Sequence, residues 1–343
     1  MEQRDRPAFR RRHVPALALA VFTLAALVPG AATAHPPDAP TLETLRLFDP
    51  AALETPENIV LDRAGNQYIS LALTGEVRKI APDGTQSTLI QFPIGAPLTF
   101  CGPFFNAVTG ITIDRQERYL YASVVSCDLG SRGVWRVALR DGSAELLANL
   151  PLESLPNGLD LYRGDLYVAD SSLSRVWRVP AEGGEAEVWL ESPLLAGALV
   201  DGQPLPGANG LKVFHGEVYV ATSAQGTIVA IPIEPDGSAG EPRIHGVLPA
   251  GQGCDDFSFD VHGSLYCATD PSNTVVRLDP DGTTEILLTA ADGLDGPTAT
   301  AFGRTGQDRF NLYITNGAFP FFSTTHRPSL MRLHLGVPGA PPI

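Results

Sequence analysis

The chain has little positive charge for its length. Among its 343 residues, 24 are Lys or Arg and 38 are Asp or Glu, so the formal net charge is −14. Nucleic acids and anionic membrane surfaces attract basic proteins, so this balance argues against both as partners. Only 18% of the residues are charged, whereas Gly (34) and Pro (30) are plentiful. A turn-rich, weakly charged chain with many Val, Leu, Ile and Tyr residues is typical of an all-β protein.

The sequence also lacks the usual motif of a serine hydrolase. It contains no Gly-x-Ser-x-Gly element, and no Ser-His-Asp triad can be recognised. That element places a nucleophilic serine on a strand-to-helix turn. Any hydrolytic chemistry of this chain is therefore expected to use another device.

The N-terminal segment has the layout of a secretory signal peptide. Residues 10–12 are all Arg, residues 14–28 are apolar, and Ala32-Thr33-Ala34 is a small-residue cleavage site. A membrane anchor is the alternative, but a membrane span needs about 20 apolar residues and this stretch is shorter. We predict a signal peptide over residues 1–34 and a single domain over 35–343, periplasmic or secreted, without a membrane partner after cleavage.

Export would permit disulfides between the four cysteines. Four cysteines allow three pairings, and sequence alone does not choose among them. We expect Cys101–Cys127, because both residues fall in loops around the second repeat. Cys254–Cys267 is less favoured, because a two-residue turn at 262–263 would leave Cys254 four positions from the residue opposite Cys267. Free buried thiols are the other alternative.

One pattern of short strands recurs six times along the chain. In the third copy, strands over 159–162, 165–169 and 175–179 are separated by tight turns such as Arg163-Gly164. The copies are spaced by about fifty residues, which matches four-stranded propeller blades rather than solenoid coils. We predict a six-bladed β-propeller with four-stranded blades. Two β-sandwiches would need a central linker, and none is evident.

The last repeat lacks a fourth strand of its own. The chain ends soon after the strand over 330–333, whereas residues 43–48 near the N-terminus have the composition of a strand. We predict that this N-terminal strand completes the sixth blade and closes the ring, which removes the open sheet edges that invite aggregation.

Four repeats carry an oxygen-bearing side chain just before the innermost strand. The second and sixth repeats have Thr109 and Thr298 near this position. If the repeats are related by rotation, one residue from each converges on the central axis. Asn-Gly is also a favoured turn pair, but both pairs here precede an inner strand instead of joining two paired strands. The four residues are Glu57, Asn157, Asn209 and Asp255.

Two carboxylates and two amides on one axis suit a hard cation. Calcium takes six to eight oxygen ligands, so this set leaves room for waters or a substrate oxygen. The set contains no Cys or His, which disfavours structural zinc. We therefore predict bound Ca²⁺, or another divalent cation, at the tunnel mouth.

This series of axial residues resembles the gluconolactonase/regucalcin (senescence marker protein) family of six-bladed propellers. The resemblance covers nearly the whole predicted mature chain and places that family's calcium ligands on Glu57, Asn157, Asn209 and Asp255. It implies a divalent-metal-dependent hydrolase of a small lactone or related ester. The chain departs from the family pattern at Glu57-Asn58-Ile59, where Glu-Gly-Pro is usual, and at Cys254-Asp255-Asp256, where Pro-Asp-Gly is usual.

Three residues are candidates for proton transfer. Asp255 is expected to be both a ligand and the acceptor of a proton from water. Asp170, after the second strand of the third repeat, is a second candidate, although a turn-forming role explains it equally well. His326 is a third candidate, in a loop with several Phe residues that could cover the tunnel mouth; an exposed loop histidine is the alternative.

Two other functions share the predicted fold. A non-catalytic binding propeller of the NHL type would keep a structural calcium, and a lyase or synthase would not need the four-oxygen set. Apolar residues in the loops 97–106 and 194–208 lean toward a hydrophobic lactone or ester. A closed propeller can be monomeric, and we expect a monomer.

Overall fold

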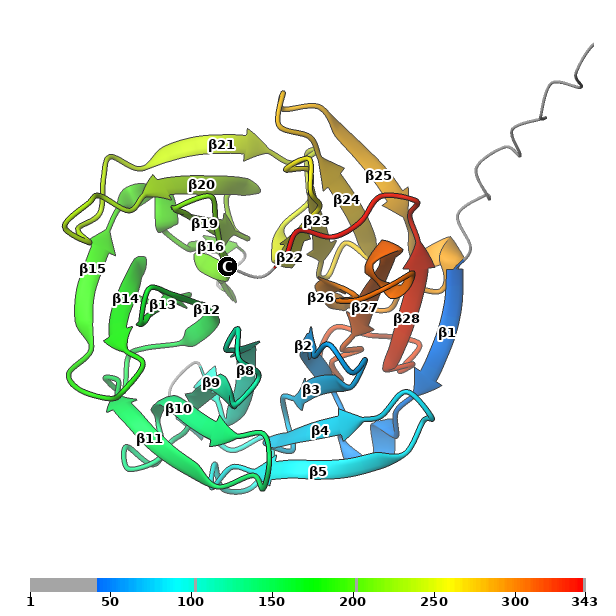
Figure 1. Cartoon of the computed structure of the whole chain (residues 1–343), viewed down its shortest axis with the longest axis horizontal. Helices are drawn as coiled ribbons and strands as arrows, with labels where there is room; N and C mark the ends of the chain where they lie inside the picture. The colour runs from blue at the N-terminus through cyan, green and yellow to red at the C-terminus, as the bar shows by residue number, and fades with distance from the viewer. Residues whose placement is uncertain (1–41, 102–103, 201–202, 342–343) are drawn as a thin grey trace, which may run out of the picture. The chain divides into compact units, whose positions relative to one another are not determined.

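The computed structural model describes residues 42–101, 104–200 and 203–341, and of Phe104, Val200, Gln203 and Pro204 it describes only the backbone. These residues form six four-stranded sheets arranged around a centre (Figure 1). The prediction of an all-β, six-bladed propeller is confirmed. The predicted signal peptide lies outside the described residues.

The first three blades follow the chain from the inner to the outer strand. Blade 1 contains β2 (Pro56–Leu61), β3 (Gln67–Leu71), β4 (Glu76–Ile80) and β5 (Gln86–Gln91). Blade 2 contains β8 (Ala107–Ile113), β9 (Tyr119–Val125), β10 (Gly133–Ala138) and β11 (Ala144–Asn149). Blade 3 contains β12 (Pro156–Tyr162), β13 (Asp165–Asp170), β14 (Arg175–Pro180) and β15 (Glu187–Glu191).

The next two blades repeat this order, and the sixth takes its outer strand from the N-terminal segment. Blade 4 contains β18 (Ala208–Phe214), β19 (Glu217–Thr222), β20 (Thr227–Pro232) and β21 (Arg243–Val247). Blade 5 contains β22 (Cys254–Phe259), β23 (Leu265–Thr269), β24 (Thr274–Leu278) and β25 (Thr284–Leu288). Blade 6 contains β26 (Pro297–Phe302), β27 (Asn311–Asn316), β28 (Ser329–His334) and β1 (Leu42–Leu47).

Closure of the ring occurs as predicted. Strand β1 pairs antiparallel with β28, with Leu42 opposite Leu333 and Leu47 opposite Ser329. The inner strand β26 in turn lies beside the inner strand β2 of blade 1. Blade 6 is therefore built from the two ends of the domain (Figure 1).

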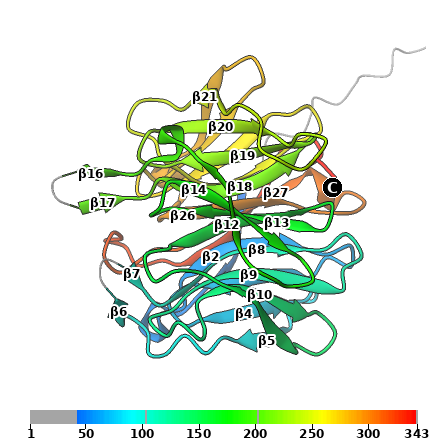
Figure 2. The same ribbon diagram turned by 90° about the vertical axis from the view of Figure 1, so that its left-hand side faces the viewer.

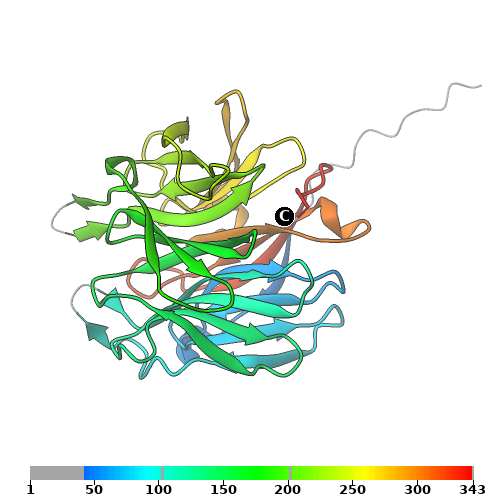
Figure 3. The ribbon, with the colours of Figure 1, turned by 60° about the vertical axis from the view of Figure 1, so that its left-hand side comes forward.

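Two small hairpins mark one face of the propeller. They are β6 (Phe100–Cys101) with β7 (Phe104–Phe105), and β16 (Ala198–Val200) with β17 (Gln203–Leu205). Both connect an outer strand to the next inner strand, so they lie on the face where the inner strands begin. Figures 2 and 3 show both hairpins on the same side. We call this side the site face.

Helical structure in the described residues is limited to short 3₁₀ turns. These are η1 (Pro50–Ala52), η2 (Pro193–Leu195), η3 (Ala290–Asp292) and η4 (Asp308–Phe310). None of the helices in this part of the chain has the length and apolarity needed to cross a bilayer.

Hydrophobic cores lie between neighbouring blades. The cluster between blades 3 and 4, for example, joins Tyr167 and Val176 to Leu211 and Val218. Each second strand carries a tyrosine that is almost fully buried, and burial of such large rings contributes much of the packing energy. These tyrosines are Tyr68, Tyr121, Tyr167, Tyr219, Tyr266 and Tyr313.

Every inner strand is irregular near its start. In each blade the pairing of the first and second strands shifts register there. In blade 5, for instance, the shift falls between Cys254 and Phe257. Such bulges bend a strand and re-aim its side chains, and they are common beside active sites. Here they turn the residues at the start of each inner strand toward the axis.

The blade 5 irregularity also explains an incorrect prediction. Both disulfides form: Cys101–Cys127 as predicted, and Cys254–Cys267, which the sequence interpretation disfavoured. The hairpin turn is longer than assumed, and Phe257 pairs with Cys267. The bulge then takes up Asp255 and Asp256, which brings the Cα atoms of Cys254 and Cys267 to 5.4 Å.

Candidate metal and substrate site

The four predicted ligands open four different inner strands on the site face. Glu57 lies in β2, Asn157 in β12, Asn209 in β18 and Asp255 in β22. Glu57, Asn157 and Asn209 are buried, and Asp255 is half-buried. The structure thus places all four at one end of the tunnel, with an amide on each of two adjacent blades and a carboxylate on each of two others.

Glycine allows the inner strands to approach one another around the axis. A Cβ atom at Gly158 would lie 2.4 Å from the backbone nitrogen of Leu211, and one at Gly210 would lie 2.5 Å from the carbonyl oxygen of Asp255. Real Cβ atoms do not make contacts this short. The Asn-Gly pairs therefore serve close backbone packing, which settles the turn alternative raised by the sequence.

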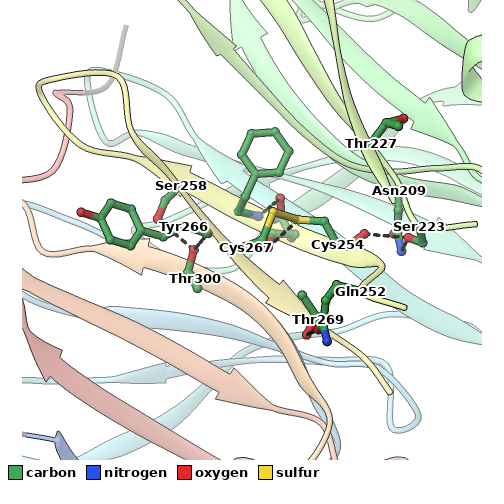
Figure 4. The surroundings of a disulfide bond; sticks show 12 residues. Asn209, Ser223, Thr227, Gln252, Cys254, Ser258, Tyr266, Cys267, Thr269 and Thr300 are labelled. Carbon is green, nitrogen blue, oxygen red and sulfur yellow. Dashed lines mark hydrogen bonds between the residues drawn. A yellow bond between two sulfur atoms is a disulfide. The ribbon is translucent and has the colours of Figure 1, made fainter. Parts of the chain in front are cut away.

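Serine side chains orient both amides. The Nδ2 atom of Asn209 donates to Ser223 Oγ at 2.9 Å, and Ser223 Oγ donates to the Cys254 carbonyl at 2.7 Å (Figure 4). Asn157 and Ser171 repeat this arrangement, with Ser171 donating to the next blade at Ala208. Because each amide donates outward to a hydroxyl, its oxygen is left to face the axis.

The threonines of the remaining two blades have structural roles. Thr109 Oγ1 donates to the Pro156 carbonyl at 2.8 Å, and Thr298 Oγ1 donates to the Pro56 carbonyl at 3.1 Å. Each therefore ties its blade to the next one, and neither presents a charged oxygen.

Two oxygens at the axis lack partners. Glu57 Oε2 and Asn209 Oδ1 are buried and have no hydrogen-bond partner among the described residues. An unsatisfied buried polar atom is costly. A cation between them would satisfy both.

The carboxylates at the axis are crowded by one another. Burial, and then the charges of Asp270 and Asp256, raise the pKa of Glu57 to about 8. Burial and the charges of Glu57, Asp270 and Asp256 raise the pKa of Asp255 well above its usual value, and a hydrogen bond with Asn209 opposes this rise. Burial and mutual repulsion destabilise the ionised carboxylates, and a bound cation would stabilise them.

The fit to a metal depends on the amides. Among the described residues, no group of three or more Asp, Glu, His and Cys side chains could hold a metal ion by itself. The two carboxylates and two amides together still match the oxygen donors that calcium takes. The residues present therefore fit a hard cation with a flexible coordination geometry better than zinc.

Asp256, the residue after Asp255, is held by side chains from two other blades. The neighbouring Asp256 is buried and accepts both Lys212 Nζ, at 2.8 and 2.6 Å, and Asn58 Nδ2, at 2.6 Å. Lys212 thus brings a positive charge to Asp256, the residue next to the predicted ligand Asp255. Its contact with Asp256 links blade 4 to blade 5, and Asn58 links blade 1 to blade 5.

Asp170 is held by contacts within blade 3. It is fully buried, and its two oxygens accept hydrogen bonds from Ser154 Oγ, Trp177 Nε1 and the backbone amides of residues 155, 172 and 173. These five donors favour the turn-forming role that the sequence left open.

His326 lies in the loop between β27 and β28, which is on the site face. It is exposed, and its backbone N–H donates to Ser323 Oγ at 2.8 Å. Two neighbouring aromatic residues of its loop contact the hairpin that precedes blade 2: Phe319 and Phe321 pack against Phe105 of β7 at ring-centroid distances of 6.4 and 5.4 Å. The loop thus makes apolar contacts, as predicted, while the His326 side chain is exposed to solvent.

Asp270 is the site residue that the sequence interpretation missed. It follows β23 and is close enough to act on the pKa of both Glu57 and Asp255. Burial and the charge of Asp295 raise the pKa of Asp270 to about 7. Alignment of the second strands on their buried tyrosines would have found it, because Asp270 takes the position that Ser171 and Ser223 hold in blades 3 and 4.

Comparison with known proteins agrees with this architecture. Residues 198–318 match the SMP-30/Gluconolactonase/LRE-like region. That segment includes Asn209, Asp255 and Asp270. The predicted family resemblance is confirmed. No curated protein sequence matches the chain.

Several solved propellers share the fold at low sequence identity. A luciferin-regenerating enzyme is 15% identical with a TM-score of 0.64, and the alignment covers 89% of this chain and 99% of that chain. A calcium-binding regucalcin from Agrobacterium tumefaciens is 15% identical with a TM-score of 0.58, covering 84% and 93%. A gluconolactonase from Xanthomonas campestris is 19% identical with a TM-score of 0.56, covering 87% and 95%. Identities this low establish the shared fold alone.

Proposed function

We propose that the chain is a divalent-metal-dependent hydrolase of a small lactone or related ester, with calcium as the expected cation. The observation that carries this proposal is the pair of partnerless buried oxygens, Glu57 Oε2 and Asn209 Oδ1, beside Asp255. The match to a gluconolactonase-like region supports the choice of substrate class.

Glu57, Asn157, Asn209 and Asp255 would hold the cation through their side-chain oxygens. When bound, the cation would polarise the substrate carbonyl and stabilise the oxyanion formed on attack by water. Asp255 would take the proton of that water at a carboxylate oxygen. It is preferred to Asp170, whose oxygens are engaged, and to the exposed His326.

We further propose that the protein acts outside the cytoplasm, in the periplasm or as a secreted protein. The signal-like residues 1–34 motivate this proposal, and the two disulfides support it because such bonds persist in oxidising compartments. N-terminal sequencing of the exported protein is expected to begin at His35. Retention of residues 1–34 would contradict it.

Calorimetric titration of chelator-treated protein with calcium tests the metal site. We expect wild-type protein to bind calcium and Asp255→Ala to weaken binding at least about 100-fold, because a charged ligand is lost. The matched control is Asp281→Ala, in an exposed turn between β24 and β25 of the same blade.

The outcome separates the candidate functions. Calcium binding together with hydrolysis in a panel of lactones and esters supports the hydrolase. Calcium binding without turnover of any panel member would replace it with a non-catalytic binding propeller that keeps a structural calcium. Absence of calcium binding in the wild type would overturn calcium as the cation, and absence of binding of any divalent cation would overturn the metal-dependent function.

A further inference from the structure

A cavity of about 240 Å³ opens on the site face next to the axial carboxylates. It lies between three segments: the loop that follows β23, the connection from η3 to β26, and the loop over 317–328 between β27 and β28. Its lining includes Asp270, the residue that acts on the pKa of Glu57 and Asp255. One wall of the cavity is therefore shared with the axial site.

Two aspartates line this cavity and differ in the hydrogen bonds that their carboxylates accept. Asp295 Oδ2 accepts hydrogen bonds from Ser323 Oγ, Thr325 Oγ1 and the backbone N–H of Arg327, so it anchors the loop that forms the outer wall. The carboxylate of Asp270 accepts no hydrogen bond from the described residues. Asp295 is a structural anchor, whereas Asp270 is open to a ligand.

The backbone beside Asp270 leaves its carboxylate accessible. Gly296 has a φ of +58°, and a Cβ atom there would lie 3.2 Å from Asp270 Oδ1. The Gly296 N–H donates instead to Asn273 Oδ1 at 2.6 Å, which fixes the turn. A side chain at position 296 would crowd the oxygen that glycine leaves free.

The other walls combine apolar side chains with polar ones, among them Asn273, Thr324 and Arg327. Leu294 is buried beneath the cavity, and Phe319 and Phe322 come from the anchored loop. The volume is slightly below the range of about 300–1,000 Å³ for drug-sized ligands, so it suits a small molecule or one substituent of it. Because the unpaired Asp270 carboxylate lies in the same cavity as Leu294 and Phe319, the cavity favours a donor group next to an apolar group.

We propose that this cavity binds the substituent of the substrate, with a hydroxyl or protonated amine donating to Asp270 and an apolar group against Leu294 and Phe319. The proposal rests on the proposed hydrolase function and specifies its substrate class. An anionic group placed beside Asp270 would meet a like charge, so it is expected to bind there more weakly than a donor. Asp270 thus selects substrates, while the four axial residues hold the cation.

Binding of non-hydrolysable lactams tests this selection. The probes are butyl-2-pyrrolidinones that carry, in turn, a hydroxymethyl, an aminomethyl, a methoxymethyl or a carboxymethyl group. Titration calorimetry is done with calcium-loaded wild type at pH 8.5, above the pKa of Asp270 of about 7. At least one donor-bearing probe is expected to bind about tenfold more tightly than the methyl ether, as a hydrogen bond to a charged group implies. The carboxymethyl probe is expected to bind most weakly.

Asp270→Ala should reduce the preference for a donor to about twofold or less and improve binding of the carboxymethyl probe. Asp270→Asn should retain part of the preference for the hydroxyl, since its amide oxygen still accepts, and should lose the preference for the amine. Asp281→Asn, in the exposed turn of the same blade, controls for a change of net charge. Circular dichroism checks that each variant is folded.

Equal binding of all four probes to wild type would overturn the proposal, as would failure of both donor-bearing probes to bind, or a donor preference that survives Asp270→Ala. The same titrations with calcium-free protein separate this proposal from the metal site. If calcium does not bind, the proposal of a calcium-dependent hydrolase fails, but a donor preference that depends on Asp270 still supports the cavity. If calcium binds and the preference is absent, only the cavity proposal fails.

Discussion

Blades 4 and 5 share one strand plan and differ in the charge that they bring to the axis. The three matching positions hold, in blade 4 and then in blade 5, Asn209 and Asp255, Gly210 and Asp256, and Ser223 and Asp270. In blade 4 an amide and a hydroxyl satisfy each other across 2.9 Å. In blade 5 all three positions are acidic, so no residue of the set can donate to another in its ionised form.

This difference shows how a repeated scaffold acquires a site. In blade 4 the axial amide is oriented by a serine of the same blade, which also bonds the backbone of the next blade. In blade 5 the buried Asp256 is stabilised by side chains from other blades. Lys212 of blade 4 and Asn58 of blade 1 both reach Asp256, and the Cys254–Cys267 disulfide spans the bulge itself (Figure 4). One blade therefore carries the charge, and its neighbours hold it in place.

The largest effect on stability is expected from replacing a glycine in the inner strand of blade 4. Gly210→Ala would place Cβ 2.5 Å from the Asp255 carbonyl oxygen and 2.6 Å from Asp256 Cα. Because both are backbone atoms, the strands must separate, and we expect the free energy of unfolding to fall by about 3–4 kcal/mol. Denaturant unfolding measures this loss.

Gly130→Ala is the matched control for that substitution. Its Cβ would approach only the Asp128 side chain, at 3.4 Å or more. A loss below about 1 kcal/mol is expected there. Equal losses in the two variants would show that close strand packing at the axis is not what requires Gly210.

The next effect tests whether blade 5 depends on its neighbour's cation. Lys212→Met would leave the buried Asp256 carboxylate with Asn58 as its remaining side-chain donor. Because Lys212 is partly exposed, we expect a loss of about 2–3 kcal/mol in unfolding free energy, less than for a fully buried pair.

A second variant identifies the cause of that loss. Adding Asp256→Asn removes the unpaired charge and should recover part of the stability lost by Lys212→Met. If the double variant is as unstable as the two single losses added together, the lysine does not act through Asp256.

The crowded carboxylates predict a dependence of stability on pH. The folded-state pKa of Glu57, about 8, exceeds its usual value of 4.5. Its contribution is fully present below pH 4.5 and is lost as pH rises through 8, so calcium-free protein should lose about 2 kcal/mol between pH 6 and pH 8. Thermal or denaturant unfolding at both pH values measures the change.

Glu57→Gln should reduce this dependence because its side chain does not titrate, and the raised pKa values of Asp255 and Asp270 account for what remains. Calcium should reverse the trend in wild type, since cation binding strengthens as the carboxylates lose protons. Calcium-free wild type that is equally stable at pH 6 and pH 8 would show that these carboxylates are not crowded in the folded protein.

The smallest effect is expected in the neutral blade. Ser223→Ala removes the hydroxyl between Asn209 and the Cys254 carbonyl, which should cost about 1 kcal/mol of unfolding free energy. Calcium affinity should fall a few-fold, because the Asn209 amide loses its orientation. Ser143→Ala, in an exposed turn, is the control. An unchanged calcium affinity would mean that the amide is oriented without Ser223.

The features predicted correctly from the sequence are those that repeat. The spacing of strands and turns indicated six blades, and the repeat pattern indicated that Glu57, Asn157, Asn209 and Asp255 lie at the start of inner strands. Their role as metal ligands stays a prediction. The outer strand of blade 6 was predictable because the last repeat is short. These inferences need only the period of the chain, which survives large changes in side chains.

The features that were missed depend on register. Cys254 and Cys267 become neighbours only because a bulge takes up Asp255 and Asp256. Asp270 follows a second strand, so its place beside Asp255 depends on how two strands pair. Pairing inferred from the turn alone gives the wrong residue opposite Cys267. Alignment of Tyr167, Tyr219 and Tyr266 instead gives the correct position of Asp270.

The pairing of β1 with β28 constrains when the molecule can fold. Strand β1 begins at Leu42 and its partner β28 ends at His334, so the first described strand pairs only after the last described strand has been synthesised. A contact of such long sequence separation makes closure a late and slow step. Until then the edge of β28 is open, and a truncated product lacking β28 would be left with unpaired edges that invite association between chains.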